Sequence, residues 1–177
     1  DGDPGGSPCP GALSFPTGIA VDRQQRLYVV EANSGSVAVI DLVAQRLLRR
    51  VAVCGHPADV VADCGRALVL LRKPQRLVWI DGRRGPLRGP ALAAPCGYGP
   101  LIPHRVTRGP LVLWRRPTGG YALVADADGG VLFEVPGATD LDIDGAGQLV
   151  VARRAGEPFL RWRRSGSGWV ELEPVSA

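Results

Sequence analysis

The feature that most constrains the fold is a segment that recurs along the chain. Its clearest copy, residues 16–41, reads PTGIAVDRQQRLYVVEANSGSVAVID. Three short runs rich in Val, Ile and Tyr alternate there with polar turns, and two of the runs close on an aspartate, Asp22 and Asp41. Runs of β-branched and aromatic residues separated by Asp, Asn, Ser and Gly are typical of an antiparallel meander. We expect a fourth, outer strand at residues 46–53.

Later segments repeat this pattern. Asp63 closes PADVVAD 41 residues after Asp22, and Asp81 closes RLVWID 40 residues after Asp41. Asp144 closes ATDLDID 122 residues after Asp22, about three periods, so a degraded copy must lie between. Its candidate strands are residues 102–106, 111–115, 121–125 and 131–135. An aspartate copied into every repeat has a structural explanation, because it can form the turn that ends the first strand.

Four-stranded units that repeat about every 40 residues predict a β-propeller, since helical signals are almost absent. We predict an all-β protein with blades at about residues 16–54, 55–95, 96–136 and 137–174, after a flexible Gly/Pro-rich lead-in over residues 1–15. We also expect the large aromatic side chains to pack between blades. The ring either closes with four blades or is part of a larger ring, and the small number of repeats favours the larger ring.

Composition argues against two classes of partner. The formal net charge is +4, carried almost wholly by arginine, since Lys73 is the only lysine. Most arginine pairs fall at expected strand ends, and no helix or aromatic-basic motif accompanies them, so we predict no nucleic-acid partner. The sequence contains no run of about 18 apolar residues, so it predicts no membrane helix. The compartment stays open.

The four cysteines do not form a metal-binding pattern. Cys9, Cys54, Cys64 and Cys96 are widely spaced and contain no C-x-x-C pair. Cys54 and Cys64 flank the first strand of the second repeat and could form a disulfide, although ordinary thiols are the favoured interpretation.

The motifs P-x-G-I-A-V-D, R-L-Y-V-V-E and V-x-V-I-D in residues 16–41 resemble NHL, YVTN and SMP-30-like propeller repeats. This resemblance implies the architecture and leaves the activity open. The Arg-rich form of the repeat in residues 29–53, 55–71 and 77–90 is similar to propeller segments in phage-tail-like proteins of bacterial contractile injection systems. That similarity implies a non-enzymatic structural component whose partners are other protein subunits or the remaining blades of a ring.

The alternative is a lactonase or lyase-type propeller enzyme. Asp59 and Asp140 occupy equivalent places in innermost strands, with Gly18 as their counterpart in the first repeat. With Glu31, Asn33 or Asp142, they could offer oxygen ligands to Ca²⁺ or a similar ion at the central channel.

SMP-30-like lactonases use a comparable carboxylate and amide set, although an aspartate at a strand start more simply caps backbone N–H groups. Lyases of this propeller type employ a histidine base, which makes His56 and His104 the candidates for catalysis. On balance we predict no catalytic residue and no cofactor. An enzyme should bring the carboxylates and a histidine together at one mouth of the channel, whereas a scaffold need not.

Overall fold

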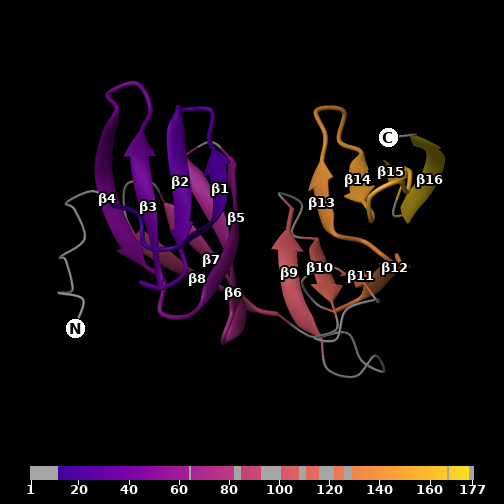
Figure 1. Ribbon diagram of the computed structural model, residues 1–177, viewed down its shortest axis with the longest axis horizontal. Coiled ribbons are helices and arrows are strands. Elements are labelled where there is room, and N and C mark those ends of the chain that lie inside the picture. The colour runs from indigo at the N-terminus through magenta and orange to yellow at the C-terminus, as the bar shows by residue number, and fades with distance from the viewer. Residues whose placement is uncertain are drawn as a thin grey trace, which may run out of the picture.

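The computed structural model describes residues 12–63, 65–81, 85–92, 101–107, 111–115, 122–125, 129–166 and 168–175. Within these ranges the protein is built from strands and turns, and none of the described segments is a helix long and apolar enough to span a membrane. The described residues form sixteen strands in four antiparallel sheets of four strands each, and in every sheet the strands lie in chain order (Figure 1). The sequence prediction of an all-β chain of four-stranded units is confirmed.

The first two sheets follow the two best-preserved copies of the repeat. The strands of the first sheet are β1 (Pro16–Val21), β2 (Arg26–Glu31), β3 (Ser36–Asp41) and β4 (Arg46–Ala52). Those of the second are β5 (Pro57–Asp63), β6 (Arg66–Arg72), β7 (Gln75–Asp81) and β8 (Gly85–Ala91). The outer strand β8 pairs with β7 through an irregular register, as its glycines and prolines suggest.

The third and fourth sheets have shorter inner strands. The third contains β9 (Ile102–Val106), β10 (Val112–Arg115), β11 (Ala122–Ala125) and β12 (Val131–Glu134). The fourth contains β13 (Asp140–Ile143), β14 (Leu149–Ala152), β15 (Phe159–Ser165) and β16 (Gly168–Val175). All four strands expected in the degraded copy are therefore present.

The recurring aspartates form the turn that follows the innermost strand. The Asp22 carboxylate accepts hydrogen bonds from the backbone N–H groups two and four residues later, at 2.8 and 3.0 Å. Asp144 repeats both contacts at 2.9 and 2.8 Å. Each turn then needs one residue with a left-handed backbone, which is Gln25 (φ 59°) in the first sheet and Gly147 (φ 78°) in the fourth. The structural interpretation of Asp22 and Asp144 is confirmed, whereas the side chain of Asp63 lies outside the described part.

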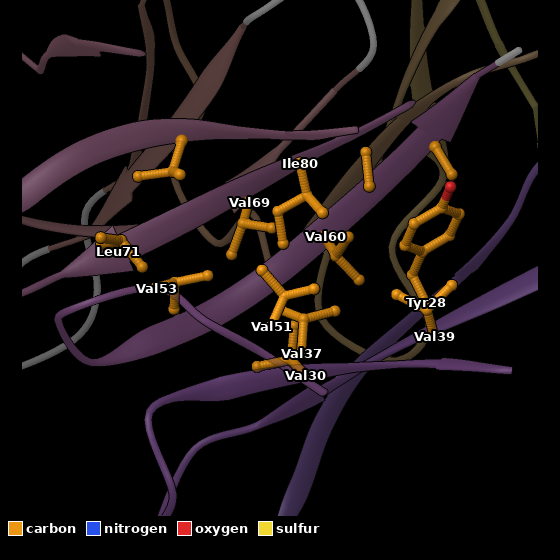
Figure 2. Close-up of a cluster of buried hydrophobic side chains, with 13 residues drawn as sticks. Tyr28, Val30, Val37, Val39, Val51, Val53, Val60, Val69, Leu71 and Ile80 are labelled. Atoms are coloured by element: carbon orange, nitrogen blue, oxygen red, sulfur yellow. The ribbon is translucent and has the colours of Figure 1, made fainter. Parts of the chain in front are cut away.

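The core lies between neighbouring sheets. Figure 2 shows the cluster between the first two sheets, where Tyr28, Val30 and Val39 of the first meet Val60 and Val69 of the second. A second cluster joins the second and third sheets around Trp114, and a third joins the third and fourth sheets around Leu113 and Trp162. The expectation that tryptophans pack between blades is met at Trp114 and at Trp162, whose ring stacks on Phe133 with centroids 4.6 Å apart.

The innermost strands follow one another around an arc. β1 packs beside β5, β5 beside β9, and β9 beside β13. In Figure 1, β1 lies in the left half of the molecule and β13 in the right half. Gly18 of β1 allows a close approach to β5, because a Cβ atom there would lie 3.2 Å from the Cα of Asp59. The arrangement brings the starts of the innermost strands around one centre.

Candidate functional site: the central hollow and the end faces

The innermost strands surround an open hollow of about 680 Å³. Its lining comes from β1, β5, β9 and β13, with further residues from β14 and β15 of the last sheet. Apolar side chains, among them Ile19, Val61 and Phe159, make up much of the wall, and the charged groups are Asp59, Arg105 and the Asp140–Asp142 pair of β13. Two of the predicted candidates, Asp59 and Asp140, are therefore brought together at the centre.

A guanidinium lies between these two carboxylates. Arg105 Nη1 is 3.3 Å from Asp59 Oδ1, and Arg105 Nε is 3.1 Å from Asp140 Oδ1. The first contact also has hydrogen-bond geometry, whereas the second is an ion pair without it. Arg105 thus neutralises part of the negative charge that a divalent cation would need at the same place.

Asp59 is fixed more firmly than Asp140. Its side chain belongs to a residue that is only 7% exposed, and its second oxygen accepts a hydrogen bond from the Val106 backbone N–H at 3.0 Å. Burial raises the pKa of Asp59 above the usual 3.8, and the Val106 and Arg105 contacts offset only part of that effect. Asp140 and Asp142 are exposed, and each accepts a hydrogen bond from the backbone N–H of the next residue. Such local contacts are what strand-start aspartates make in a purely structural role.

Glu31 lies elsewhere. It is 1% exposed on the first sheet and does not line the hollow. Its oxygens accept hydrogen bonds from Arg50 Nε at 3.0 Å, from the Ser36 hydroxyl at 2.9 Å and from the Ser14 backbone N–H at 3.1 Å. Burial by itself would raise the pKa of Glu31, but these hydrogen bonds outweigh it and hold the pKa below 4.5. Glu31 therefore fastens the chain before β1 to the first sheet and is a poor companion for Asp59 in a metal site.

The two histidines do not reach the carboxylates. His56 is exposed before β5, and its backbone pairs with the turn between β6 and β7. His104 is half-buried on β9 with Nδ1 3.4 Å from Arg72 Nη2, and neither histidine lines the hollow. Burial lowers the pKa of His104 below 6.5, the charges of Arg115, Arg105 and Arg72 lower it further, and the charge of Asp140 offsets part of that effect. A catalytic base needs an orienting acid within hydrogen-bond reach. Around His104, three guanidinium groups outweigh the charge of Asp140.

The described residues contain no group of three His, Cys, Asp or Glu side chains placed to hold a metal ion. The set proposed for Ca²⁺ is divided between the hollow, which has Asp59 and Asp140, and the far side of the first sheet, which has Glu31. Ca²⁺ takes six to eight oxygen ligands. The residues present in the hollow do not fit that requirement while Arg105 occupies the space between the two carboxylates.

The cysteines add no site within the described residues. Cys54 has an exposed free thiol. Cys9, Cys64 and Cys96 lie outside the part of the chain that the structure describes. The predicted possibility of a Cys54–Cys64 disulfide therefore stays a prediction.

One face of the first sheet has no neighbouring sheet among the described residues. Its exposed part, which we call the first end face, is defined by Ile19, Val21, Leu27, Ile40 and Leu47, whereas Val29 and Ala38 on the same face are buried. Of the five defining residues, the last four form one cross-strand row over the four strands of the sheet. Ile19 is 69% exposed and Val21 is 43% exposed, and the other three are at least partly exposed.

The second sheet shows what these positions do when a neighbour is present. Val60 and Ala62 are the counterparts of Ile19 and Val21, and they are 2% and 3% exposed because they pack on the first sheet. Ala67 and Ile80 are likewise the buried counterparts of Leu27 and Ile40. The first end face is therefore a blade-contact face that no described residue covers fully.

The fourth sheet has the complementary open face, the last end face, defined by Val150, Ala152, Arg161 and Leu172. All four residues are partly exposed. Their equivalents in the first sheet include Tyr28 and Val30, which are fully buried in the contact with the second sheet. The first and last sheets thus present two different faces, and Ile19 of one and Val150 and Ala152 of the other line the same hollow.

Sequence reasoning missed both Arg105 and the end faces. Arg105 follows the two residues Pro103 and His104, which draw attention by type, and its pairing with Asp59 and Asp140 joins three strands that are far apart in the chain. The end faces could not be found from periodicity, because an apolar residue contributes equally to the sequence pattern whether or not a neighbouring blade covers its side chain.

Comparison with known proteins places the fold. No family model matches the sequence, and no curated protein matches it. Solved structures do: hydrazine synthase of Kuenenia stuttgartiensis has a TM-score of 0.59 at 17% identity over 89% of this chain and 53% of its own. Virginiamycin B lyase of Staphylococcus aureus has a TM-score of 0.56 at 11% identity over 89% of this chain and 69% of its own. The propeller domain of Myceliophteria thermophila Cps50 (Swd1) has a TM-score of 0.59 at 12% identity, over 83% of this chain and 51% of its own.

The chain has the β-propeller fold. At these identities the likeness shows the fold alone, and the activities of the solved proteins differ. The chain spans about half the length of the hydrazine synthase chain that it matches. The four sheets are propeller blades, and the hollow is the part of the central channel that they surround.

Proposed function

We propose that this protein is a non-enzymatic β-propeller module that scaffolds or binds other protein. The observation that carries the proposal is the pair of open end faces. Ile19 and Val21 stay largely exposed at positions whose counterparts Val60 and Ala62 are buried between blades. The same repeat positions form a packed contact elsewhere in the chain, and covering exposed apolar area lowers the free energy. These positions therefore suit a binding surface.

The charges of the hollow support the same proposal. Arg105 pairs with both Asp59 and Asp140, so the two carboxylates are engaged with the protein's own cation. Glu31 and both histidines do not line the hollow. An enzyme of the lactonase or lyase type would use such groups toward substrate, metal or proton transfer.

For the kind of assembly, we propose a structural role in a phage-tail-like particle of the contractile injection type. The support is the similarity of the Arg-rich repeats in residues 29–53, 55–71 and 77–90 to propeller segments of such particles. The test is co-sedimentation of the tagged full chain with large particles from lysates of the source bacterium. We expect the chain in the particle fraction, and a chain that stays in the slowly sedimenting fraction overturns this role.

The competing function is a small-molecule enzyme with a cation in the channel, favoured by the convergence of Asp59 and Asp140 on the hollow. Structures of similar fold include virginiamycin B lyase and a gluconolactonase-like protein. Native mass spectrometry with and without Ca²⁺ separates the two functions. We expect no retained metal in the wild type, and stoichiometric Ca²⁺ that is lost in Asp59→Asn would favour the enzyme instead.

A further inference from the structure

Resting on the proposed function, we infer that residues 12–15 form a displaceable strap that covers part of the first sheet and limits how much of its apolar surface a protein partner can bind. In the free protein the strap occupies this surface. A partner that covers more of the sheet than the first end face must displace the strap.

Backbone groups fasten the strap to the first sheet. They are one N–H and two carbonyls: the Ser14 N–H donates to Glu31 Oε1 at 3.1 Å, Arg50 Nη2 donates to the Ala12 carbonyl at 2.8 Å, and the Ala32 N–H donates to the Phe15 carbonyl at 3.1 Å. Glu31 and Arg50 also pair with each other at 3.0 Å. These two side chains therefore act together as a latch that binds peptide backbone.

The strap and the latch lie over buried apolar residues of a face that has no neighbouring sheet among the described residues. Val29 and Ala38 are cross-strand neighbours on this face, beside the exposed Ile19, and they are 1% and 0% exposed. Arg50 is the next residue of the same cross-strand row, and its guanidinium reaches from there to Glu31 and to the strap. Release of the strap would therefore add Val29 and Ala38 to the first end face.

The second sheet indicates that the strap takes the place of a blade. Leu71 is the counterpart of Glu31, while Val69 and Val78 are the counterparts of the two residues beneath the latch. All three are buried in the apolar contact with the first sheet. The position of Glu31 is thus apolar where a blade covers it, and it is a carboxylate that accepts a backbone N–H where the strap covers it.

The strap is held in a way that permits displacement. Its large apolar side chains stay exposed, Leu13 by 40% and Phe15 by 63%. Phe15 also has a left-handed backbone, with φ 52°, which an aromatic residue rarely adopts. The hydrogen bonds of the strap replace hydrogen bonds to water and so add little net stability. A partner that buries apolar area on Val29 and Ala38 gains a contribution that the strap does not make.

The experiment is amide hydrogen exchange of the full chain, followed by NMR at Ala32, whose N–H is bonded to the strap. Ser14→Pro removes the N–H that binds Glu31 and should raise the exchange rate at Ala32 at least about tenfold. The matched control is Leu13→Pro, which adds the same residue but removes an N–H without a hydrogen-bond partner among the described residues. It should leave the exchange rate unchanged. Circular dichroism of both variants checks that the sheets are retained.

The fluorescence of anilinonaphthalene sulfonate, a dye that binds exposed apolar surface, measures the uncovered area. The signal should rise about twofold or more in Ser14→Pro and stay at the wild-type level in Leu13→Pro. Arg50→Met, which removes the guanidinium of the latch, should raise both the dye signal and the exchange rate at Ala32. An unchanged exchange rate or an unchanged dye signal in Ser14→Pro overturns the inference.

Co-sedimentation with large particles separates this inference from the proposed function. A larger sedimenting fraction for Ser14→Pro than for the wild type supports regulation by the strap, and an equal fraction overturns that regulation. If neither chain sediments while exchange at Ala32 and the dye signal both rise in Ser14→Pro, the proposed assembly role fails and the displaceable strap is supported.

Discussion

Replacing Asp22 by alanine should destabilise the protein much more than the same change at its counterpart Asp144. Both carboxylates accept two backbone N–H groups of the turn that follows the innermost strand. Asp22 is buried and accepts a third hydrogen bond, from the Tyr28 hydroxyl at 3.2 Å, whereas Asp144 is exposed. Comparing the two substitutions therefore separates the effect of burial and of the added Tyr28 hydrogen bond from the effect of the turn itself.

The sizes of the two effects follow from these contacts. Loss of a carboxylate that caps backbone N–H groups in an exposed turn costs about 1 kcal/mol, which is our expectation for Asp144→Ala. Asp22→Ala also leaves a buried hydroxyl without its partner, which adds about 2 kcal/mol and makes the total about 3 kcal/mol. For a chain of this length these values correspond to decreases in Tm of about 3 and about 9 °C.

Urea denaturation at pH 7, followed by tryptophan fluorescence, measures both free energies of unfolding. Tyr28 supplies a second readout: burial, the charge of Asp22 and the hydrogen bond to it raise the pKa of Tyr28 to about 12. Ultraviolet titration of Asp22→Ala should show that pKa moving back toward 10. Equal destabilisation by the two substitutions, together with an unchanged Tyr28 pKa, would refute the reasoning.

Two further predictions concern the first blade. Because hydrogen bonds hold the pKa of Glu31 below 4.5 in the folded protein, its stabilising effect should be present above the unfolded pKa and lost as the pH falls through the folded value. The difference in unfolding free energy between wild type and Glu31→Gln should therefore shrink below pH 4.5, and a difference independent of pH would contradict it. Gly18→Ala should cost about 1–2 kcal/mol by the same urea assay, since its Cβ would lie 3.2 Å from the backbone of Asp59. Gly145→Ala, where no atom lies within 4 Å, is the control and should be close to neutral, so equal effects would argue against a tight β1–β5 approach.

Local chemistry explains why the strands were predictable. Turn-forming aspartates and β-branched runs act within a few residues, so the copy at residues 16–41 specifies β1, β2 and β3 without help from the rest of the chain. The same logic found β9–β12, although their motif is degraded, because strand spacing survives when individual residues change. The role of Asp22 and Asp144 was predictable for the same reason.

The candidate site was only half predictable. Equivalence of repeat positions placed Asp59 and Asp140 at one centre, and the structure agrees. It could not reveal that Arg105 pairs with both, since an ion pair between β5, β9 and β13 joins residues far apart in the chain. Glu31 was grouped with them, yet its side chain pairs with Arg50 and does not line the hollow.

By itself, then, the sequence determined an all-β chain of four-stranded blades, because periodicity and turn chemistry are local properties that a single repeat already contains. Only the tertiary structure decided which apolar positions are buried against a neighbouring blade. Ile19 and Val60 occupy the same place in the repeat, and one is 69% exposed while the other is 2% exposed. The difference is the neighbouring blade, which covers Val60 and is missing from Ile19, and burial is a property of the arrangement of blades in space.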